Sequence, residues 1–299
     1  MHEPDAHGFV ALPAPIDLAL TLGPIAHGRG DPTIRFGPDG IWRSTRTPVG
    51  PATIRLQVVA SGVEVSAWGA GAAEAIAGAP DLVGANDDPT AFVPHHRLIG
   101  ELVHRFPGLR LPRTNRPFEA LLPAICEQKV PGVDARDAFR GIIASHGEDA
   151  PGPAGMRLPP APGTLAALPY FAFHRFGLER RRADLIRITA QLASRIEGAT
   201  PTEAHARLEA IPGIGPWTLA EVGRIAFGDP DALSVGDYHL PNVVAWALLR
   251  EPRADDARML ELLEPYRGQR GRVQRLLEVS GIGAPRYGPR MAAQPIAEI

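Results

Sequence analysis

The sequence predicts an α+β protein, with a small strand-rich α/β domain over residues 1–90 and a larger all-α domain over residues 91–299. Two observations support this division. Residues 33–69 consist of short runs rich in Val, Ile, Thr and Trp, separated by Gly/Pro turns, which is typical of strands. After about residue 92, apolar residues recur at helical spacing, most clearly over residues 240–248.

The elements can be placed in order along the chain. Strands are expected over residues 33–36, 40–46, 52–60 and 63–69, and an alanine-rich helix over residues 70–77. Helices are then expected over residues 92–106, 117–128, 133–145, 178–196, 202–210, 217–227, 237–249 and 255–265. At 299 residues, the chain is long enough for two domains with well-buried cores.

The composition excludes several classes of protein. The longest strongly apolar run, residues 243–249, is too short to span a bilayer, and the N-terminus is acidic where a signal peptide would be basic. We therefore expect a cytoplasmic monomer with no membrane partner. The single cysteine, Cys126, excludes an intramolecular disulfide and a four-cysteine metal site. His95, His96 and His104 lack metal-ligand spacing, so no metal held by side chains is expected.

The segment Ile-Pro-Gly-Ile-Gly-Pro separates the helices expected over 202–210 and 217–227. Gly213 and Gly215 can adopt conformations closed to other residues and leave no side chain in the way. Consecutive N–H groups just before a helix N-terminus form a concave anion site, which suits a DNA phosphate. A glycine turn that only joins two helices would account for the same residues.

The wider context of this turn resembles a known family. "LEAIPGIGPWTLAEV", followed by "GDPDALSVGDYHL", is similar to the helix-hairpin-helix DNA glycosylases, specifically to the 3-methyladenine DNA glycosylase II branch. The resemblance extends back through "FPGLRLPRTNRPFEALLPAICEQKV" and covers about residues 16–280. It implies a helix-hairpin-helix at about 202–227 whose Gly213, Ile214, Gly215 and Thr218 contact DNA.

The resemblance implies that Asp237 is the catalytic residue. Cleavage of an N-glycosidic bond builds positive charge on the sugar, which a carboxylate stabilises, and a carboxylate can also deprotonate the attacking water. Asp237 lies at the expected start of a helix, where the dipole favours a negative charge. Simple capping of that helix is the alternative, and one residue can serve both roles.

The resemblance also implies a base pocket, to which we assign Trp217, Gln128, Glu221 and Tyr238. A base flipped out of the duplex needs an aromatic surface, and an indole face attracts cationic alkylated purines. Related bifunctional glycosylases carry a lysine at the position of Trp217. Its replacement implies a monofunctional enzyme in which water attacks and an abasic site is left.

Other DNA contacts are expected from basic residues. Residues 265–290 contain six arginines against the single acid Glu278, and we assign Arg267, Arg270 and Arg272 to DNA, although a solvated helix face would explain the same charge. Lys129 is the only lysine and stands where the family has an apolar wedge. It is interpreted as a polar wedge, a Schiff-base nucleophile or an incidental loop residue.

The sequence therefore predicts a DNA repair glycosylase that removes alkylated purines of the 3-methyladenine and 7-methylguanine type from damaged double-stranded DNA by base flipping. No cofactor is expected, beyond a monovalent cation that the resemblance places on the carbonyls of Ile211 and Ile214. Two alternatives stay open: a damaged-DNA-binding module without catalysis, and a glycosylase for deaminated or oxidised purines with lyase activity through Lys129.

Overall fold

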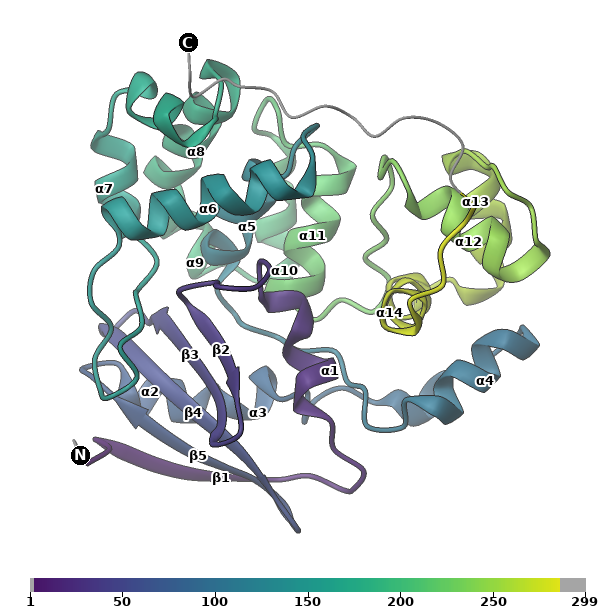
Figure 1. Cartoon of the computed structure of the whole chain (residues 1–299), viewed down its shortest axis with the longest axis horizontal. Helices are drawn as coiled ribbons and strands as arrows, with labels where there is room; N and C mark the ends of the chain where they lie inside the picture. Colours follow the sequence, from purple (N-terminus) through teal and green to yellow (C-terminus); the bar gives the residue numbers. More distant parts are fainter. Residues whose placement is uncertain (1–2, 286–299) are drawn as a thin grey trace.

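The computed structural model describes residues 3–285. Its N-terminal part is a five-stranded antiparallel sheet in the order β1-β5-β4-β3-β2 (Figure 1). The strands are β1 (Ala6–Ala11), β2 (Ile34–Gly37), β3 (Gly40–Arg46), β4 (Pro51–Val59) and β5 (Gly62–Trp68). Four of them match the predicted strands; β1 was missed because its short run contains histidine and glycine, which weaken the strand pattern.

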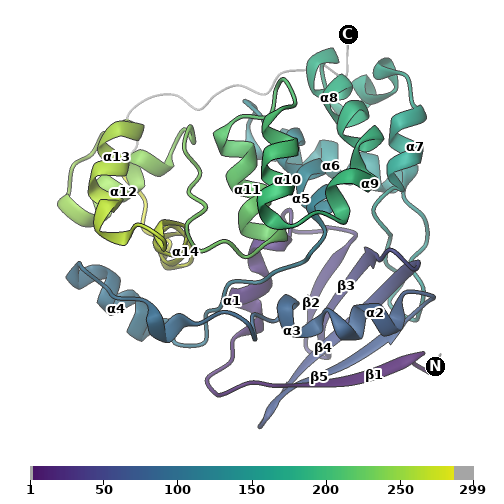
Figure 2. The same cartoon turned by 180° about the vertical axis from the view of Figure 1, so that it is seen from behind.

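Helices cover the sheet and then form the rest of the molecule. Near the sheet lie α1 (Leu18–Leu22), η1 (Gly23–Ile25), α2 (Ala72–Ala77) and α3 (Ala79–Leu82), and Figure 2 shows α2 and α3 against one face. The next elements are η2 (Pro89–Ala91), α4 (Arg97–Arg105), α5 (Pro117–Cys126), α6 (Gly132–His146), α7 (Pro162–Ala167) and η3 (Tyr170–Phe176). The predicted α+β class is confirmed, with the sheet in the N-terminal part and helices over most of the rest.

The remaining helices carry the candidate site. They are α8 (Arg180–Gln191), α9 (Ala193–Glu197), α10 (Pro201–Glu209), α11 (Pro216–Ala226), α12 (Leu240–Leu249), α13 (Asp256–Leu263), η4 (Glu264–Tyr266) and α14 (Arg270–Ser280). The helix expected over 178–196 is divided into α8 and α9, and α14 was not among the predicted helices. The helix expected from residue 237 begins at Leu240, so Asp237 precedes it.

The apolar contacts divide the helices between two main cores. One core joins the sheet to α5, α6 and α8–α11, so sheet and helices share buried residues such as Ile54, Leu121 and Ile186. The other joins α4 to α12–α14 around Val244, Met259 and Val273. In Figure 1 the second group forms a separate lobe, and the loop from α11 to α12 connects the two. The candidate site lies at this connection.

Within residues 3–285, none of the helices combines the length and apolar character needed to cross a bilayer.

Candidate active site

The turn between α10 and α11 is a tight hairpin built on two buried isoleucines. Ile211 and Ile214 are buried, and the Ile214 N–H donates to the Ile211 carbonyl at 3.0 Å. Gly213 has φ +103°, a conformation that a residue with a Cβ rarely adopts. Pro216 begins α11, where its missing N–H costs no hydrogen bond. The glycine at 213 is therefore required by the backbone of the turn itself.

Gly215 is different, because the chain itself does not require a glycine there. Its φ of −107° and ψ of 179° describe extended backbone that any residue adopts. A Cβ built on Gly215 would meet no heavy atom of the protein within 4 Å. The absent side chain leaves open space at the N-terminus of α11, where the N–H groups of the first turn have no intrahelical acceptor.

Gln128 fastens the hairpin to the end of α5. Its Nε2 donates to the Gly213 carbonyl and to Thr218 Oγ1, both at 3.0 Å. Thr218 is 2% exposed, so its hydroxyl does not face the surface expected to contact DNA. The amide nitrogen of Gln128 likewise holds the hairpin together, although the residue was assigned to the base pocket. Lys129, the next residue, is exposed and has a left-handed φ of +56°.

Asp237 lies two residues before His239, the N-cap of α12, and closes the turn that leads into this helix. Its Oδ1 accepts the N–H groups of His239 and Leu240, both at 2.7 Å. Its own N–H donates to the Ser234 carbonyl at 3.1 Å. Both side-chain hydrogen bonds use one oxygen, which fixes the carboxylate and leaves Oδ2 without a hydrogen bond to any residue from 3 to 285. The carboxylate thus binds the backbone at the start of α12, although His239 and not Asp237 is the N-cap.

The loop that carries Asp237 lies directly against Trp217. A Cβ built on Gly236 would lie 3.9 Å from the Trp217 Cβ, and Gly236 has φ +92°. Trp217 is half-buried in the first turn of α11. Tyr238 is 86% exposed, and the centroid of its ring lies 4.9 Å from that of the His239 ring. The fold therefore brings the loop of Asp237 and Tyr238 next to the start of the Trp217 side chain.

Glu221 is hydrogen-bonded through its carboxylate to Arg224 and Ser234. Its carboxylate accepts from Arg224 Nη1 at 3.0 Å and from the Ser234 hydroxyl, and its side chain is 19% exposed. Burial raises the pKa of Glu221, and Arg224 and the Ser234 hydroxyl only partly oppose that rise. Assignment of Glu221 to the base pocket is therefore at odds with the structure, because the carboxylate is committed to an internal ion pair.

The arginines assigned to DNA each form an ion pair with an acid of the chain. Arg267 forms an ion pair with Glu264 at 2.9 Å but is well exposed. Arg270 Nε contacts Asp231 Oδ1 at 2.8 Å. Arg272 is 4% exposed and bridges to Asp87 at 3.1 Å, so assignment of its guanidinium to DNA is wrong. Of the other three arginines of the cluster, Arg275 pairs with Glu278 at 3.2 Å, and Arg286 and Arg290 lie outside the described residues.

Two carbonyls of the hairpin, those of Ile211 and Gly213, already accept hydrogen bonds within the protein. The Ile211 oxygen accepts the Ile214 N–H, and the neighbouring Gly213 oxygen accepts the Gln128 amide. Each carbonyl keeps a second lone pair, so a monovalent cation at Ile211 and Ile214 stays a prediction. Among the side chains of residues 3–285, no group of three or more His, Cys, Asp or Glu is placed to hold a metal ion.

Sequence reasoning missed the residues that hold the Asp237 loop from outside. Gln274 on α14 bonds Ser234 through both its amide atoms, and Asp256 on α13 accepts the Gly236 N–H at 3.1 Å. Neither residue belongs to a recognisable motif. Gln274 is 40 residues from Ser234, so only the packing of α14 reveals the contact.

Similar proteins were found by sequence and by structure. No protein-family model matches the chain. A Mycobacterium tuberculosis protein described as a probable bifunctional transcriptional activator/DNA repair enzyme AlkA is 27% identical over 143 residues. That match covers 46% of this chain and 29% of the relative, so the chain spans less than a third of the relative's length.

Two solved structures match over almost the whole chain. The 3-methyladenine DNA glycosylase from Archaeoglobus fulgidus gives a TM-score of 0.75 at 17% identity, covering 91% of this chain and 97% of that one. The Clostridium acetobutylicum 8-oxoguanine glycosylase/lyase, solved with double-stranded DNA, gives 0.66 at 15% identity, covering 88% and 90%. The chain therefore has the fold of the helix-hairpin-helix DNA glycosylases and resembles their 3-methyladenine glycosylase branch.

Proposed function

We propose that the chain is a DNA glycosylase that hydrolyses the N-glycosidic bond of alkylated purines in double-stranded DNA and leaves an abasic site. One observation carries the proposal: the loop of Asp237 lies beside Trp217 at the N-terminus of the second hairpin helix, where a Cβ added to Gly236 would lie 3.9 Å from the Trp217 Cβ. A carboxylate that stabilises a sugar cation and a ring that receives the base must be neighbours, because the bond to be broken joins sugar to base.

The hairpin supports DNA binding at the same end of α11. Gly215 has open space where a Cβ would lie, and its extended backbone does not need a glycine. A DNA phosphate would occupy that space and accept the free N–H groups of the first turn. Side-chain cations are not needed for this contact, which fits a chain whose net charge is −2.

The carboxylate geometry fits a hydrolytic role. Oδ1 of Asp237 is held by two N–H groups, so the second oxygen keeps a constant direction. That oxygen would face the positive charge that develops on the sugar and would orient or deprotonate the attacking water. Because bases such as 3-methyladenine and 7-methylguanine carry positive charge, they leave readily, and the Trp217 ring would attract them through its face. Tyr238, exposed beside the carboxylate, would add a second stacking surface.

The proposed mechanism is monofunctional. Trp217 occupies the hairpin position at which a Schiff-base lysine would be needed, so water is the attacking group. Lys129 is the one lysine of the chain, and it is exposed next to Gln128 at the edge of the hairpin. We propose that it contacts a phosphate or fills the gap left by the flipped nucleotide with its aliphatic stem.

The test is release of free bases from methylated duplex DNA under single-turnover conditions. The wild type should release 3-methyladenine, and Asp237→Asn should be slower by at least about 100-fold, since general-base and electrostatic help are both lost. Asparagine keeps an oxygen that can accept the N–H groups at the start of α12, so the melting temperature of the variant serves as the folding control. Intact DNA binding without release by the wild type would favour a damage-binding module or another lesion.

A parallel sample with borohydride tests the mechanism. No trapped protein–DNA adduct is expected from the wild type, because hydrolysis forms no Schiff base. An adduct that disappears in Lys129→Ala would contradict the monofunctional mechanism and identify Lys129 as a nucleophile.

A further inference from the structure

The part of the loop nearest Asp237 is attached to α14 by one glutamine, while Arg270 and the Arg272 N–H hold the loop farther back, at Asp231 and Pro230. Gln274 Oε1 accepts the Ser234 N–H at 3.0 Å, and Gln274 Nε2 donates to Ser234 Oγ at 2.9 Å. Gln274 and Ser234 are 3% and 1% exposed, so water does not compete for these bonds. One side chain thus bonds both the backbone and the hydroxyl of Ser234. The hydroxyl also donates to Glu221, so loss of Gln274 would leave the buried Ser234 N–H without its acceptor, which is costly.

A neighbouring carboxylate fixes which way the glutamine amide points. Nε2 of Gln274 also donates to Glu278 Oε1 at 2.9 Å. An ionised carboxylate only accepts hydrogen bonds, so the amide nitrogen must face Glu278 and the amide oxygen must face the Ser234 N–H. Glu278 is itself held by Arg224 at 2.9 Å and Arg275 at 3.2 Å. Burial opposes ionisation of Glu278, but these two guanidinium groups outweigh it and lower its pKa.

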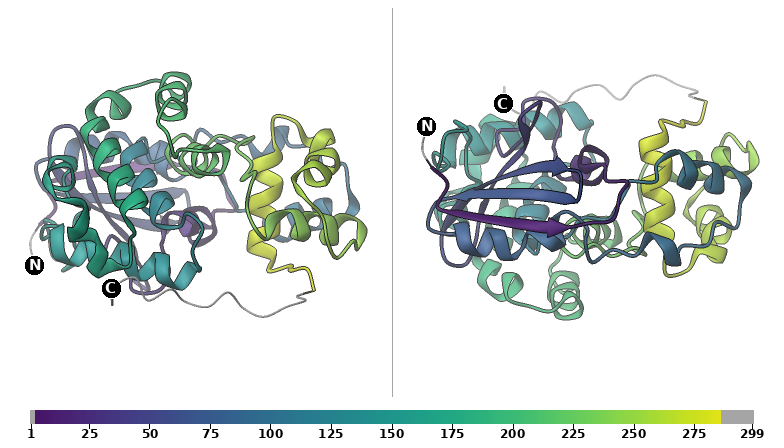
Figure 3. Two further views of the ribbon diagram at one scale, coloured as in Figure 1. Left: turned by 90° about the horizontal axis from the view of Figure 1, so that it is seen from above. Right: turned by 90° about the horizontal axis from the view of Figure 1, so that it is seen from below.

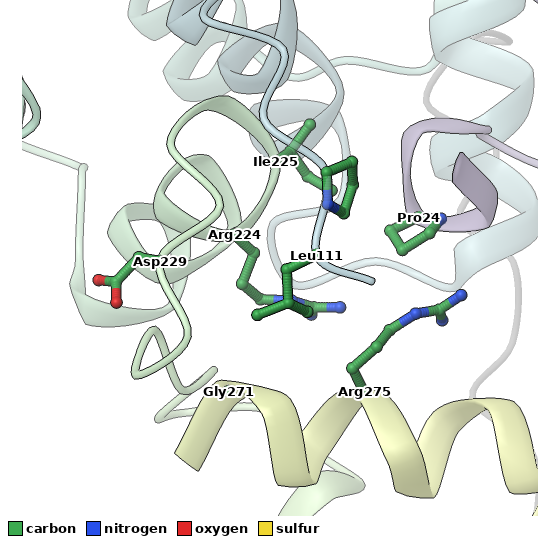
Figure 4. A pocket seen from close by; sticks show the side chains of 8 residues that line it. Pro24, Leu111, Arg224, Ile225, Asp229, Gly271 and Arg275 are labelled. Atoms are coloured by element: carbon green, nitrogen blue, oxygen red, sulfur yellow. The ribbon is translucent and has the colours of Figure 1, made fainter. Parts of the chain in front are cut away.

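The arginines tie this arrangement to the rest of the molecule. Arg224 belongs to α11 and Arg275 to α14, and Figure 4 shows their side chains directed into the same small cavity. Arg275 Nη2 donates to the Leu20 carbonyl at 2.6 Å, which anchors α14 to α1. Viewed from above and below, α14 stands between the hairpin side of the molecule and the α12–α13 lobe (Figure 3). The helix is therefore a fixed support from which a side chain can hold the loop.

Ser234 is in turn hydrogen-bonded to the backbone of Asp237. The Ser234 carbonyl accepts the Asp237 N–H at 3.1 Å, so the two residues close one turn of the loop. Between them, Gly236 donates its N–H to Asp256 Oδ1 at 3.1 Å. The N–H groups of Ser234 and Gly236 are thus held by Gln274 and Asp256, while the Asp237 carboxylate accepts the N–H groups of His239 and Leu240.

We propose that Gln274 is a positioning residue for Asp237: by fixing Ser234, it sets the place of the carboxylate relative to Trp217. The proposal rests on the proposed function for its kinetic consequence, whereas its structural consequence can be measured without catalysis. Misplacement of a reacting group by about 1 Å lowers a rate by about 100-fold, so the loss of this support should appear in the chemical step rather than in DNA affinity.

The test compares Gln274→Ala with Ser44→Ala in the full chain. Ser44 is 1% exposed and donates its hydroxyl to the Arg157 carbonyl in the N-terminal sheet, so it controls for loss of a buried hydrogen bond remote from Asp237. Amide hydrogen exchange is followed in the peptide covering residues 234–240, and single-turnover base release and DNA affinity are measured on the same samples. In Gln274→Ala, exchange in this peptide should rise and the rate should fall by about 10- to 100-fold with DNA affinity unchanged.

Gln274→Glu adds a pH readout in a variant of nearly unchanged shape. The introduced carboxylate can accept the Ser234 N–H but cannot donate, and it lies beside Glu278. Its rate relative to the wild type should recover as the pH falls, because a protonated carboxyl regains one donor and loses the like-charge repulsion. A relative rate that is flat with pH would contradict the hydrogen-bond arrangement.

The outcomes separate the two proposals. Unchanged exchange over 234–240 in Gln274→Ala, or faster exchange with a wild-type rate, would overturn the role of Gln274. Equal effects of Ser44→Ala on that peptide would do the same, because the response would then reflect global stability. A wild type that releases no base would overturn the proposed function, while faster exchange confined to 234–240 would still support the hold of Gln274 on the loop.

Discussion

The two hairpin glycines should respond in opposite ways to the same substitution. Gly215→Ala places a methyl group where no protein atom lies within 4 Å, on backbone that alanine adopts freely. The folded state is not strained, and the unfolded chain loses conformational freedom, so unfolding should become less favourable by about 0.4–1 kcal/mol. Gly213→Ala forces a Cβ onto φ +103° at 3.4 Å from Leu185 and should cost about 1–3 kcal/mol.

Gly215→Ala should weaken DNA binding even though it stabilises the folded protein. The added methyl group occupies the space proposed for a phosphate and blocks hydrogen bonds to a charged group worth about 1.5–3 kcal/mol. Affinity for duplex DNA should therefore fall by about 10- to 150-fold although the protein is more stable. Thermal unfolding and fluorescence anisotropy with one labelled duplex measure both quantities. A Gly215→Ala protein that binds DNA like the wild type would refute the assignment of this space to a phosphate.

The remaining predictions concern a buried ion pair, a buried acid and the indole ring. Arg272→Ala should cost about 3–5 kcal/mol of stability in denaturant titrations, because it leaves Asp87 buried and unpaired, while the salt dependence of DNA binding stays that of the wild type. Burial raises the pKa of Glu197 to about 7, so its contribution to stability is present below about pH 4.5 and is lost as the pH rises through 7. Melting curves should show that the free energy of unfolding falls by about 2–3 kcal/mol between pH 5 and 8. Glu197→Gln should abolish this loss. Trp217→Ala should slow release of cationic bases by about 3- to 30-fold more than release of neutral bases, and equal slowing of both would argue against a cation–π contact.

The sequence by itself predicted the features that depend on residues close together in the chain. Four of five strands follow from β-branched runs between turns, and the hairpin follows from glycines and a proline at fixed spacing. Asp237 was assigned from a resemblance carried by the residues around it, and its side-chain hydrogen bonds also go to residues only two and three positions along the chain. The position of Gly213 follows in the same way, since a left-handed turn is a property of one residue.

Tertiary structure decided how charges and hydrogen bonds are paired, because partners distant in sequence meet only after folding. The acids that neutralise Arg270 and Arg272 are Asp231 and Asp87, which lie 39 and 185 residues away, so a count of local charge assigned to DNA two guanidinium groups that the fold pairs internally. Glu221 was expected at the pocket, yet burial beside Arg224 commits it elsewhere. The hold of Gln274 on the Asp237 loop exists only because α14 packs between the two lobes, and no pattern in the sequence encodes that contact.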